Sequence, residues 1–202
     1  MAPKLILFNG PRHSGKDTAA LHVAKKLNAY HFKFSAPTKA AIKTAFSLSS
    51  QDVDYLESIK TQPTAILFGK SYVQAQISFS EEWAKPSFGQ DIFGRWAVNA
   101  IKNVQAESGN SKYDLFVSSD SGFACEAWPV INNLFGVENT LLVRVYRQGK
   151  TFNGDSRSYI ELPGVETVEI ENNGSIDDYH KQVIALAQDL VGYCYLSEKE
   201  EK

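Results

Sequence analysis

The residues best suited to chemistry lie near the N-terminus, in the segment Gly-Pro-Arg-His-Ser-Gly-Lys-Asp-Thr at positions 10–18. This segment matches the pattern G-x-x-x-x-G-K, in which backbone N–H groups of a glycine-rich loop surround phosphate oxygens. The Lys16 ammonium would reach the β- and γ-phosphates, and the following helix N-terminus would add partial positive charge. The pattern predicts a phosphate-binding loop made of Gly10, Pro11, Arg12, His13, Ser14, Gly15, Lys16, Asp17 and Thr18.

A carboxylate stands where this kind of loop normally carries a hydroxyl. Asp17 follows Lys16 at the position where Ser or Thr usually ligates Mg²⁺, and Thr18 comes next. Asp17 could bind the metal directly or through water, with help from Thr18. Alternatively, it could lie near the acceptor phosphate and act on the substrate or on metal-bound water. The sequence leaves these alternatives open.

A second acidic candidate for the metal is Asp120, which directly follows the apolar segment 115–119. Ligands of open α/β sheets bind at the carboxyl ends of the strands, and an aspartate there is well placed to hold Mg²⁺ waters. The alternative is an aspartate that only begins a turn before a helix. With the glycine-rich loop nearby, the sequence predicts Asp17, Thr18 and Asp120 as metal-site residues.

The elements around the loop fit this chemistry. The apolar run Leu5–Phe8 ends at Asn9-Gly10 and is typical of a buried parallel strand. After the loop, helical spacing of apolar residues is found at Ala20, Val23, Ala24 and Leu27. The chain therefore opens with strand, loop and helix, which is the context that a phosphate-binding loop requires.

Strands and helices alternate along the rest of the chain. Short apolar segments predict strands at 30–34, 113–119, 141–146 and 167–170. Helical patterns predict helices at 38–46, 88–104, 125–134 and 176–191, with Ser175 as the N-cap of the last one. The apolar stripe of the second helix is predicted to be Phe93, Trp96, Ala97, Ala100 and Val104. This alternation predicts one α/β domain, with a parallel sheet covered by helices on both faces.

Two stretches lack a clear period. Residues 47–87 contain two prolines and a glycine between short helical patterns, and they are expected to form an irregular helical insertion in which Ser50 caps a helix at 52–59. Residues 147–164 are polar and glycine-containing, which indicates a loop or flap. Arg147 and Arg157 are candidates for closing such a flap over phosphates and excluding water, or else they are solvent-exposed loop cations.

The composition limits the possible functions. The chain has 202 residues, with 21 Lys+Arg against 23 Asp+Glu and 43% hydrophobic residues. These values exclude a largely disordered chain and a coiled-coil rod. Proteins that grip duplex DNA cluster their basic residues, so the formal net charge of −2 argues against a nucleic-acid polymer as partner. A small anionic ligand remains compatible, because it needs only a few well-placed cations.

The cellular setting can also be predicted. No apolar run approaches the roughly 18–20 residues needed to cross a bilayer, and the apolar stretch near the N-terminus is too short for a secretion signal. Cys125 and Cys194 lack metal-ligand spacing, which favours two reduced core thiols over a disulfide. We therefore expect a soluble, cytoplasmic protein without membrane contact.

Five segments of the chain together resemble a known family. They are Gly10–Thr18, Phe34–Lys39, Phe88–Trp96, Ser119–Glu126 and Glu171–Ile176. The loop form G-x-x-x-S-G-K-D-T and the order of the other segments are similar to the phage-type deoxynucleoside monophosphate kinases, within the adenylate-kinase-like group of P-loop kinases. Residues 47–87 have no match in this resemblance.

The resemblance implies a three-layer P-loop kinase fold over residues 1–202, with a central parallel sheet of about five strands. It further implies a helical acceptor-side insertion at 35–87 and a flap or lid at 147–164. The implied activity uses ATP and Mg²⁺ and moves the γ-phosphoryl group to a deoxynucleoside 5′-monophosphate, which gives the diphosphate. Such a transfer depends on positioning and charge neutralisation. A phage source and a place in the host cytoplasm would follow.

The resemblance also implies roles by position. Gly10, Gly15, Lys16 and Thr18 would hold the donor phosphates. Catalytic candidates are Lys16, Asp17, Arg12, Arg147 and Arg157. The acceptor nucleotide would contact Phe34, Lys39, Gln90, Asp91, Arg95, Trp96, Phe123 and Glu126. Trp96 could stack on the base or be a core aromatic residue, and Arg95 could contact phosphate or be a surface cation.

Two positions depart from the family pattern. Gly122 stands where the pattern D-x-R-F carries an arginine, so either another residue replaces this cation or the choice of substrate has changed. The flap carries Asp155-Ser-Arg-Ser-Tyr where the family has a histidine. Alternatives are therefore another P-loop kinase of a nucleoside or phosphorylated metabolite, and a regulatory nucleotide-binding protein without catalysis. Base preference, the sugar and the oligomeric state, a homodimer included, stay open.

Overall fold

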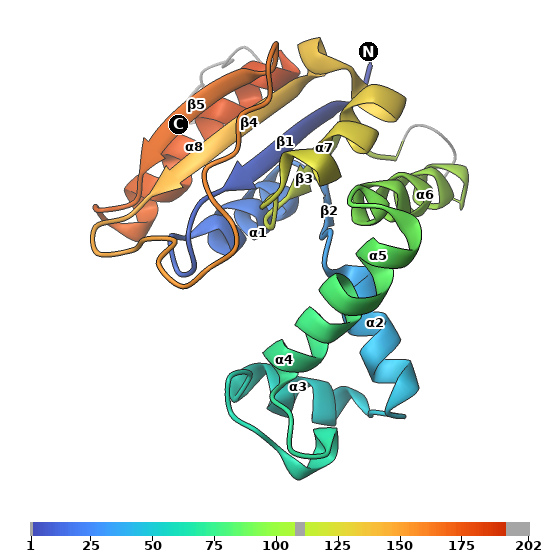
Figure 1. Ribbon diagram of the computed structural model, residues 1–202. Coiled ribbons are helices and arrows are strands. Elements are labelled where there is room, and N and C mark those ends of the chain that lie inside the picture. Colours follow the sequence, from blue (N-terminus) through green and yellow to red (C-terminus); the bar gives the residue numbers. More distant parts are fainter. Residues whose placement is uncertain (1, 108–111, 193–202) are drawn as a thin grey trace.

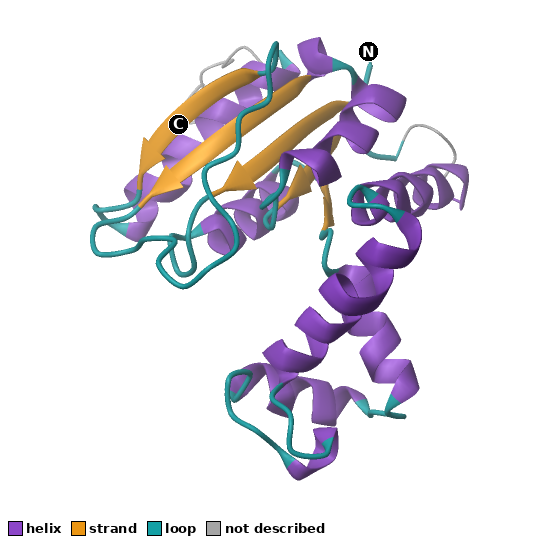
Figure 2. Ribbon diagram, viewed as in Figure 1, coloured by secondary structure: helices purple, strands orange, loops and turns teal. Residues whose placement is uncertain are grey.

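A five-stranded parallel sheet forms the centre of the computed structural model, which describes residues 2–107 and 112–192. The strands are β1 (Lys4–Asn9), β2 (Tyr30–Phe32), β3 (Leu115–Ser118), β4 (Thr140–Tyr146) and β5 (Glu166–Glu171). They lie in the order β2-β3-β1-β4-β5, and every neighbouring pair is parallel (Figure 2). The predicted α/β class with about five parallel strands is confirmed.

Helices cover both faces of this sheet (Figure 1). They are α1 (Lys16–Lys26) and α8 (Ile176–Val191) on one face, and α6 (Ile92–Glu107) and α7 (Ala124–Val130) with the π-helical turn Ile131–Phe135 on the other. Ile6 and Phe8 of β1 belong to the first core, whereas Leu5 and Leu7 belong to the second. Since successive strand side chains point to opposite faces, the unbroken apolar run of β1 fills two cores.

A helical arm extends away from the sheet between β2 and α6 (Figure 1). Its elements are α2 (Ala36–Ala45), α3 (Ser50–Ser58), the 3₁₀ turn Ala65–Leu67, α4 (Tyr72–Ile77), the π-helical turn Ser78–Ala84 and α5 (Lys85–Phe88). The arm has its own small buried cluster, made of Ile42, Leu48, Leu56, Leu67 and Tyr72. The expected helical character of this region is confirmed, but its cap is Ser49, whose hydroxyl accepts from the N–H of Asp52 at 3.1 Å.

The predicted stripe of α6 is partly wrong. Its buried residues are Ile92, Phe93, Gly94, Ala97, Val98 and Ile101, whereas Ala100 is exposed. The reason is the close approach of α7, because a Cβ on Gly94 would lie 2.2 Å from the backbone oxygen of Glu126. This contact turns Gly94 inward and rotates the buried face away from Ala100.

Other boundaries differ by a few residues. The predicted strand 30–34 ends at Phe32, and α2 begins at Ala36 with its proline in the first turn. The last helix runs over Ile176–Val191 with Ser175 as N-cap, as predicted. Cys194 lies outside the described residues, and Cys125 is exposed rather than in the core. Among residues 2–107 and 112–192, no helix has the length and apolar character to span a membrane.

Candidate phosphate-binding site

The segment between β1 and α1 forms a tight loop whose shape depends on Gly15. The φ angle of Gly15 is 109°, in the region that favours glycine. A Cβ at this position would also lie 2.3 Å from the side-chain nitrogen of Asn172. The second glycine of the pattern is therefore required both by the backbone and by the residue packed behind it.

Lys16 begins α1 and folds back over the loop. Its Nζ donates a hydrogen bond to the carbonyl of Pro11 at 2.6 Å, and only 8% of the residue is exposed. Burial, and after it the positive charge of Arg157, lower the pKa of Lys16 to about 8. A buried ammonium beside a helix N-terminus is suited to bind a polyanion, because phosphate charge offsets the cost of its burial.

Three side chains from other segments of the chain brace the loop. Arg147 Nη1 donates to the carbonyl of His13 at 3.2 Å, and Asn172 Nδ2 donates to that of Ser14 at 2.8 Å. The Tyr179 hydroxyl donates to the carbonyl of Gly15 at 3.2 Å. In a trans peptide, N–H and C=O point in opposite directions. Binding the last two carbonyls on the outer side therefore turns the N–H groups of Gly15 and Lys16 inward.

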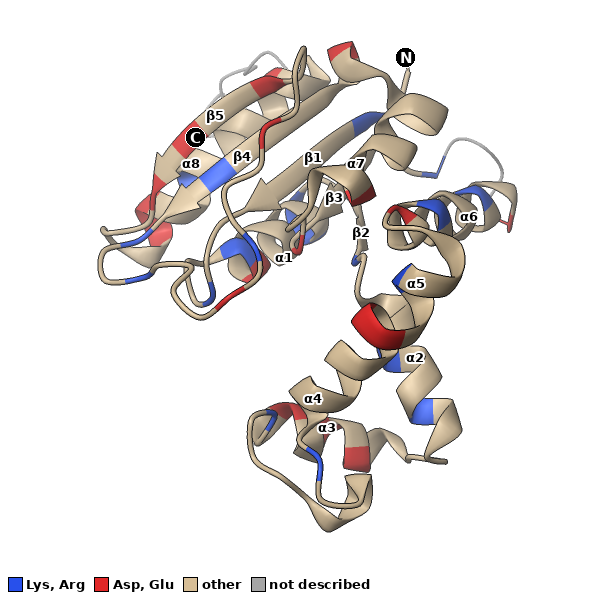
Figure 3. Cartoon of the chain, in the orientation of Figure 1, with Lys and Arg blue, Asp and Glu red and all other residues tan. Residues whose placement is uncertain are grey.

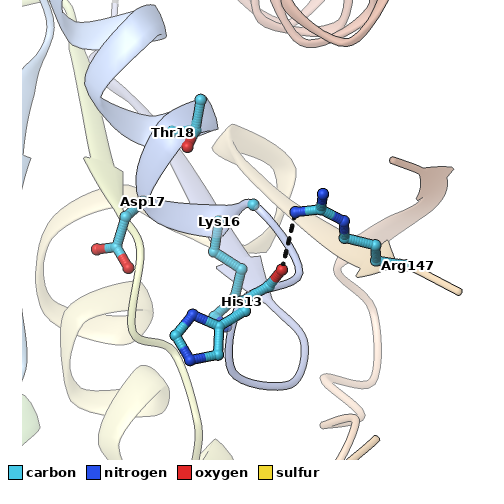
Figure 4. A pocket seen from close by; sticks show the side chains of 6 residues that line it. His13, Lys16, Asp17, Thr18 and Arg147 are labelled. Carbon is cyan, nitrogen blue, oxygen red and sulfur yellow. Dashed lines mark hydrogen bonds between the residues drawn. The ribbon is translucent and has the colours of Figure 1, made fainter. Parts of the chain in front are cut away.

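A cavity of about 270 Å³ opens on the loop (Figure 4). It is lined by His13, Gly15, Lys16, Asp17, Thr18 and Arg147. Figure 4 shows Arg147 approaching from the side of the cavity opposite Asp17. The predicted loop residues and one predicted flap arginine thus meet at one cavity, whose size and positive groups suit the phosphate chain of a nucleotide.

Asp17 faces the edge formed by β2 and β3. Its Oδ1 accepts hydrogen bonds from Lys33 Nζ at 2.5 Å and from the Ser119 hydroxyl at 2.8 Å. Partial burial favours the neutral acid, but these bonds outweigh it and hold the pKa of Asp17 below its ordinary value. His31 Nε2 lies 3.1 Å from the same hydroxyl, which continues the polar contact along β2.

Asp120 fits a metal site poorly. Its Oδ1 accepts from the N–H of Phe34 at 2.9 Å and from the Ser118 hydroxyl at 3.1 Å. Its Oδ2 accepts from the N–H and the hydroxyl of Ser35, at 3.0 and 2.7 Å. Both oxygens are thus committed to fixing the turn that leads from β2 into the arm. The sequence-based alternative, an aspartate that organises a turn, describes these contacts better.

For Mg²⁺ the chain offers a partial set of oxygen ligands. Thr18 and Asp17 line the loop cavity, and Asp17 has its Oδ2 left over from the two bonds just described. In the described part of the chain, no three His, Cys, Asp or Glu residues are grouped as metal ligands. Mg²⁺ at phosphate sites usually takes only one or two protein ligands and completes its shell with water and phosphate oxygens, so these residues fit it.

One arginine of the flap and one of the phosphate loop approach the same carboxylate, that of Asp155. Arg157 donates to Asp155 through Nε at 2.8 Å and Nη2 at 2.5 Å, and Arg12 Nε of the loop lies 4.0 Å from Asp155 Oδ2. This pairing holds the pKa of Asp155 below its ordinary value. Ile160 and Leu162 are buried in the core and anchor the end of the predicted flap, whereas residues 147–151 and 153–154 are exposed. Charges of both signs gather along these loops (Figure 3).

The predicted acceptor residues divide into groups. Phe34 is buried beside Phe32, and Lys39 forms an ion pair with Glu57 within the arm. Asp91 and Arg95 pair with each other at 3.2 Å on the first turn of α6. They line a second cavity of about 340 Å³ together with Cys125, Trp128, Pro129, Asn132 and Asn133. This lining shares no residue with that of the loop cavity.

Aromatic side chains fill the junction of arm and sheet. Trp96 is half-buried, and its ring centroid lies 5.3 Å from that of Phe93 and 6.4 Å from those of Phe79 and Phe88. These contacts support the alternative interpretation, in which Trp96 is a core aromatic residue. Gln90 is exposed, and its carbonyl lies 3.5 Å from Cys125 Sγ.

Glu126 and Phe123 surround a buried lysine that the sequence did not single out. Lys85 Nζ lies 3.6 Å from Glu126 Oε1, 2.8 Å from Glu81 Oε1 and 4.2 Å from the ring centroid of Phe123. Burial raises the pKa of Glu126 to about 7, against the opposing charge of Lys85. This cluster joins α5 of the arm to α7.

Several site residues escaped sequence reasoning, and a signal existed for some of them. Asn9 ends β1 and Asn172 follows β5, so the rule that singled out Asp120 at a strand end also applies to them. Lys33 follows β2 in the same way. Tyr179 carried only the helical pattern of α8. Lys85 carried only the i,i+4 spacing to Glu81, because its other partner Glu126 lies 41 positions away.

Comparison with known proteins finds likeness in structure but not in sequence. No protein-family model and no curated protein matches this chain. A sugar kinase from Janibacter sp. HTCC2649 aligns with a TM-score of 0.47 and 11% identity over 94% of this chain and 95% of that chain. The dephospho-CoA kinase from Campylobacter jejuni aligns with a TM-score of 0.46 and 12% identity, over 93% and 97%. Likeness at this level says nothing about the substrate.

Proposed function

We propose that this protein is an ATP-dependent phosphotransferase that acts on a deoxynucleoside 5′-monophosphate and forms the diphosphate. The main support is the structure of the loop after β1. Side chains from other segments bind the carbonyls of His13, Ser14 and Gly15, and Lys16 is buried at the cavity. A loop that is rigid before a ligand arrives, with its positive groups turned inward, is suited to stabilise charge on a phosphoryl group in transfer.

In the proposed reaction the chain acts by position and charge. The inward N–H groups of Gly15 and Lys16 and the ammonium of Lys16 bind the donor phosphates, and Arg147 approaches from the far side of the cavity. Mg²⁺, when bound with ATP, would neutralise further phosphate charge next to Thr18 and Asp17. The transition state spreads its charge over phosphate oxygens, so these residues need no nucleophilic side chain.

The acceptor is proposed to bind between the loop and the arm. Lys33 and Asp17 line that side of the loop, and Asp120 fixes the turn through which β2 enters the arm. The choice of a deoxynucleoside monophosphate depends on the resemblance described above. The observation that favours the second candidate, a P-loop kinase with another small phosphorylated acceptor, is that Asp91 and Arg95 pair with each other and line a cavity other than that of the loop.

A coupled ADP-release assay tests the proposal. The purified protein is given ATP and Mg²⁺ with each of the four common deoxynucleoside monophosphates, and with the ribonucleotides. We expect turnover with at least one of them, and stabilisation by the same acceptor in a thermal-shift assay. Turnover only with other acceptors would support the second candidate, and ATP binding without any transfer would indicate a regulatory protein.

A further inference from the structure

Gly122 is a glycine that its own backbone does not require. It lies in the loop between β3 and α7, two residues after Asp120, and its φ angle is outside the left-handed region. The sign of φ therefore does not demand a glycine here. The reason for a glycine must therefore lie in what packs against it.

The side chain of Arg157 occupies the space beside Gly122. A Cβ at position 122 would lie 2.4 Å from Cδ and 2.9 Å from Cγ of Arg157, which is closer than any real contact. The stem of Arg157 thus crosses directly over the Gly122 backbone. Both residues are shielded here, since Gly122 is buried and three quarters of the Arg157 side chain is covered.

A buried asparagine fixes the two chain segments at this crossing. Asn9 is 1% exposed and donates from Nδ2 to the carbonyl of Ser121 at 2.7 Å and to that of Ser158 at 3.2 Å. Its Oδ1 accepts from the N–H of Ile160 at 3.1 Å. The neighbours of Gly122 and Arg157 are therefore bound to one side chain, which holds the crossing in register.

The crossing places a guanidinium beside Asp155, which Arg12 of the phosphate loop also approaches. Arg157 Nη2 lies 2.5 Å from Asp155 Oδ2, and the Arg12 Nε of the loop lies 4.0 Å from the same oxygen. Two arginines that converge on one anionic oxygen form the arrangement that binds phosphate.

We infer that Gly122 is a positioning residue, whose missing side chain forms the seat of Arg157 and places this guanidinium at the phosphate loop as a phosphate-binding cation. The cation that the family pattern would carry at position 122 is thereby supplied by residue 157. The inference rests on the proposed function for the role of the phosphate, but the seat itself is a property of the chain alone.

Gly122→Ala tests the seat because it removes no charge and no hydrogen bond. Its Cβ must displace the flexible Arg157 side chain, so kcat/KM is expected to fall about tenfold to a hundredfold, as for a misplaced catalytic group. In the Arg157→Ala background the same substitution should cost nothing, because the two changes act on one interaction. Gly174→Ala is the matched control, since a Cβ there meets nothing within 4 Å.

A second readout does not depend on activity. With ¹⁵N-labelled arginine, the Nε–H signal of Arg157, assigned by its absence in Arg157→Ala, should shift in Gly122→Ala and stay unchanged in Gly174→Ala, because Nε loses its place beside Asp155 Oδ1. An unchanged Arg157 signal with full activity in Gly122→Ala, or additive losses in the double variant, would overturn the inference. If wild type transfers no phosphoryl group, the proposed function fails, while the Arg157 signal still decides whether the seat exists.

Discussion

The loop region and the helical arm are held together by different kinds of contact. Around the phosphate loop, buried polar side chains bind backbone carbonyls, and Asn9, Asn172 and Tyr179 each connect distant segments. In the arm, one small apolar cluster holds the helices, and large apolar side chains remain outside, with Phe68 87% exposed. Polar contacts therefore hold the loop region in a geometry suited to binding charge. Few contacts hold the arm, and part of its apolar surface is exposed.

The difference teaches where rigidity is needed. Charge stabilisation works best when dipoles and cations are in place before the reaction, which requires the bracing seen at the loop. If the arm binds the acceptor, as proposed, it must admit and release a substrate, and fewer contacts would favour that motion. The ion pairs of Lys85 with Glu81 and Glu126 connect the arm to α7.

Removing the loop cation should give the largest effect. Lys16→Ala is expected to lower kcat/KM by about a thousandfold, as for the loss of a preorganised charge at a phosphoryl-transfer site. The fold should persist, because a partly unfavourable buried charge is removed. ADP release and a thermal melt measure the two quantities. Lys25→Ala, on the exposed far end of α1, should change neither, and equal losses in both variants would contradict the assignment.

Breaking the junction should cost stability in a pH-dependent way. Lys85→Met leaves Glu126 buried without its cation, and the free energy of unfolding should fall by about 3 kcal/mol at pH 8. The folded-state pKa of Glu126, about 7, lies above its ordinary value. Stabilisation by its proton is therefore complete below about pH 4.5 and lost as pH rises through about 7, and Lys85→Met should cost less at pH 5.5.

Urea unfolding at both pH values measures this cost. The double variant Lys85→Met, Glu126→Leu should recover most of the lost stability, since no buried charge remains. An equal cost at pH 5.5 and pH 8 would show that packing, rather than charge, holds the arm to α7.

The pH profile of the loop gives a smaller and graded effect. The pKa of Lys16 in the free protein is about 8, and phosphate binding requires its charged form. The value of kcat/KM for ATP should therefore fall about tenfold per pH unit above pH 8. Lys16→Arg stays charged over this range and should lack that limb of the profile, whatever its absolute rate. A fall at the same pH in Lys16→Arg would assign the titration to another group.

The exposed surface of the arm should contribute least. Phe68→Ala is expected to change the free energy of unfolding by less than about 0.5 kcal/mol, because the exposed ring buries little apolar surface on folding. Its neighbour Leu67 is 2% exposed in the cluster of the arm, and Leu67→Ala should cost about 2–4 kcal/mol. Paired urea melts compare them. A large cost for Phe68→Ala would mean that its ring is covered in solution.

Local patterns predicted the loop region better than the arm. The glycine-rich segment, the apolar strand before it and the cap at Ser175 are defined by residues close together in the sequence. Gly122 and Arg157 lie 35 positions apart, and their contact depends on how two loops meet. The sequence around each of these two residues therefore gives no sign of their contact.

Trp96 and Ala100 show a second limit. Both fit a helical stripe, but the buried face of α6 was selected by the approach of α7 to Gly94. Propensity and spacing fix the existence of a helix more firmly than its rotation about its own axis. Asp120 lies at a strand end, as expected. Only the hydrogen-bond donors around its carboxylate indicate that it organises a turn rather than binding a metal.

The arm leaves the sheet after β2 and returns at α6, and Phe34 before it and Ile92 after it are both anchored in the same core cluster. A segment with both ends anchored in one core can change in length without altering the order of the strands. The chain thus separates an inherited scaffold from a replaceable module. Variation among descendants of such a gene would be expected to accumulate between residues 36 and 88, while the sheet around β1 changes slowly.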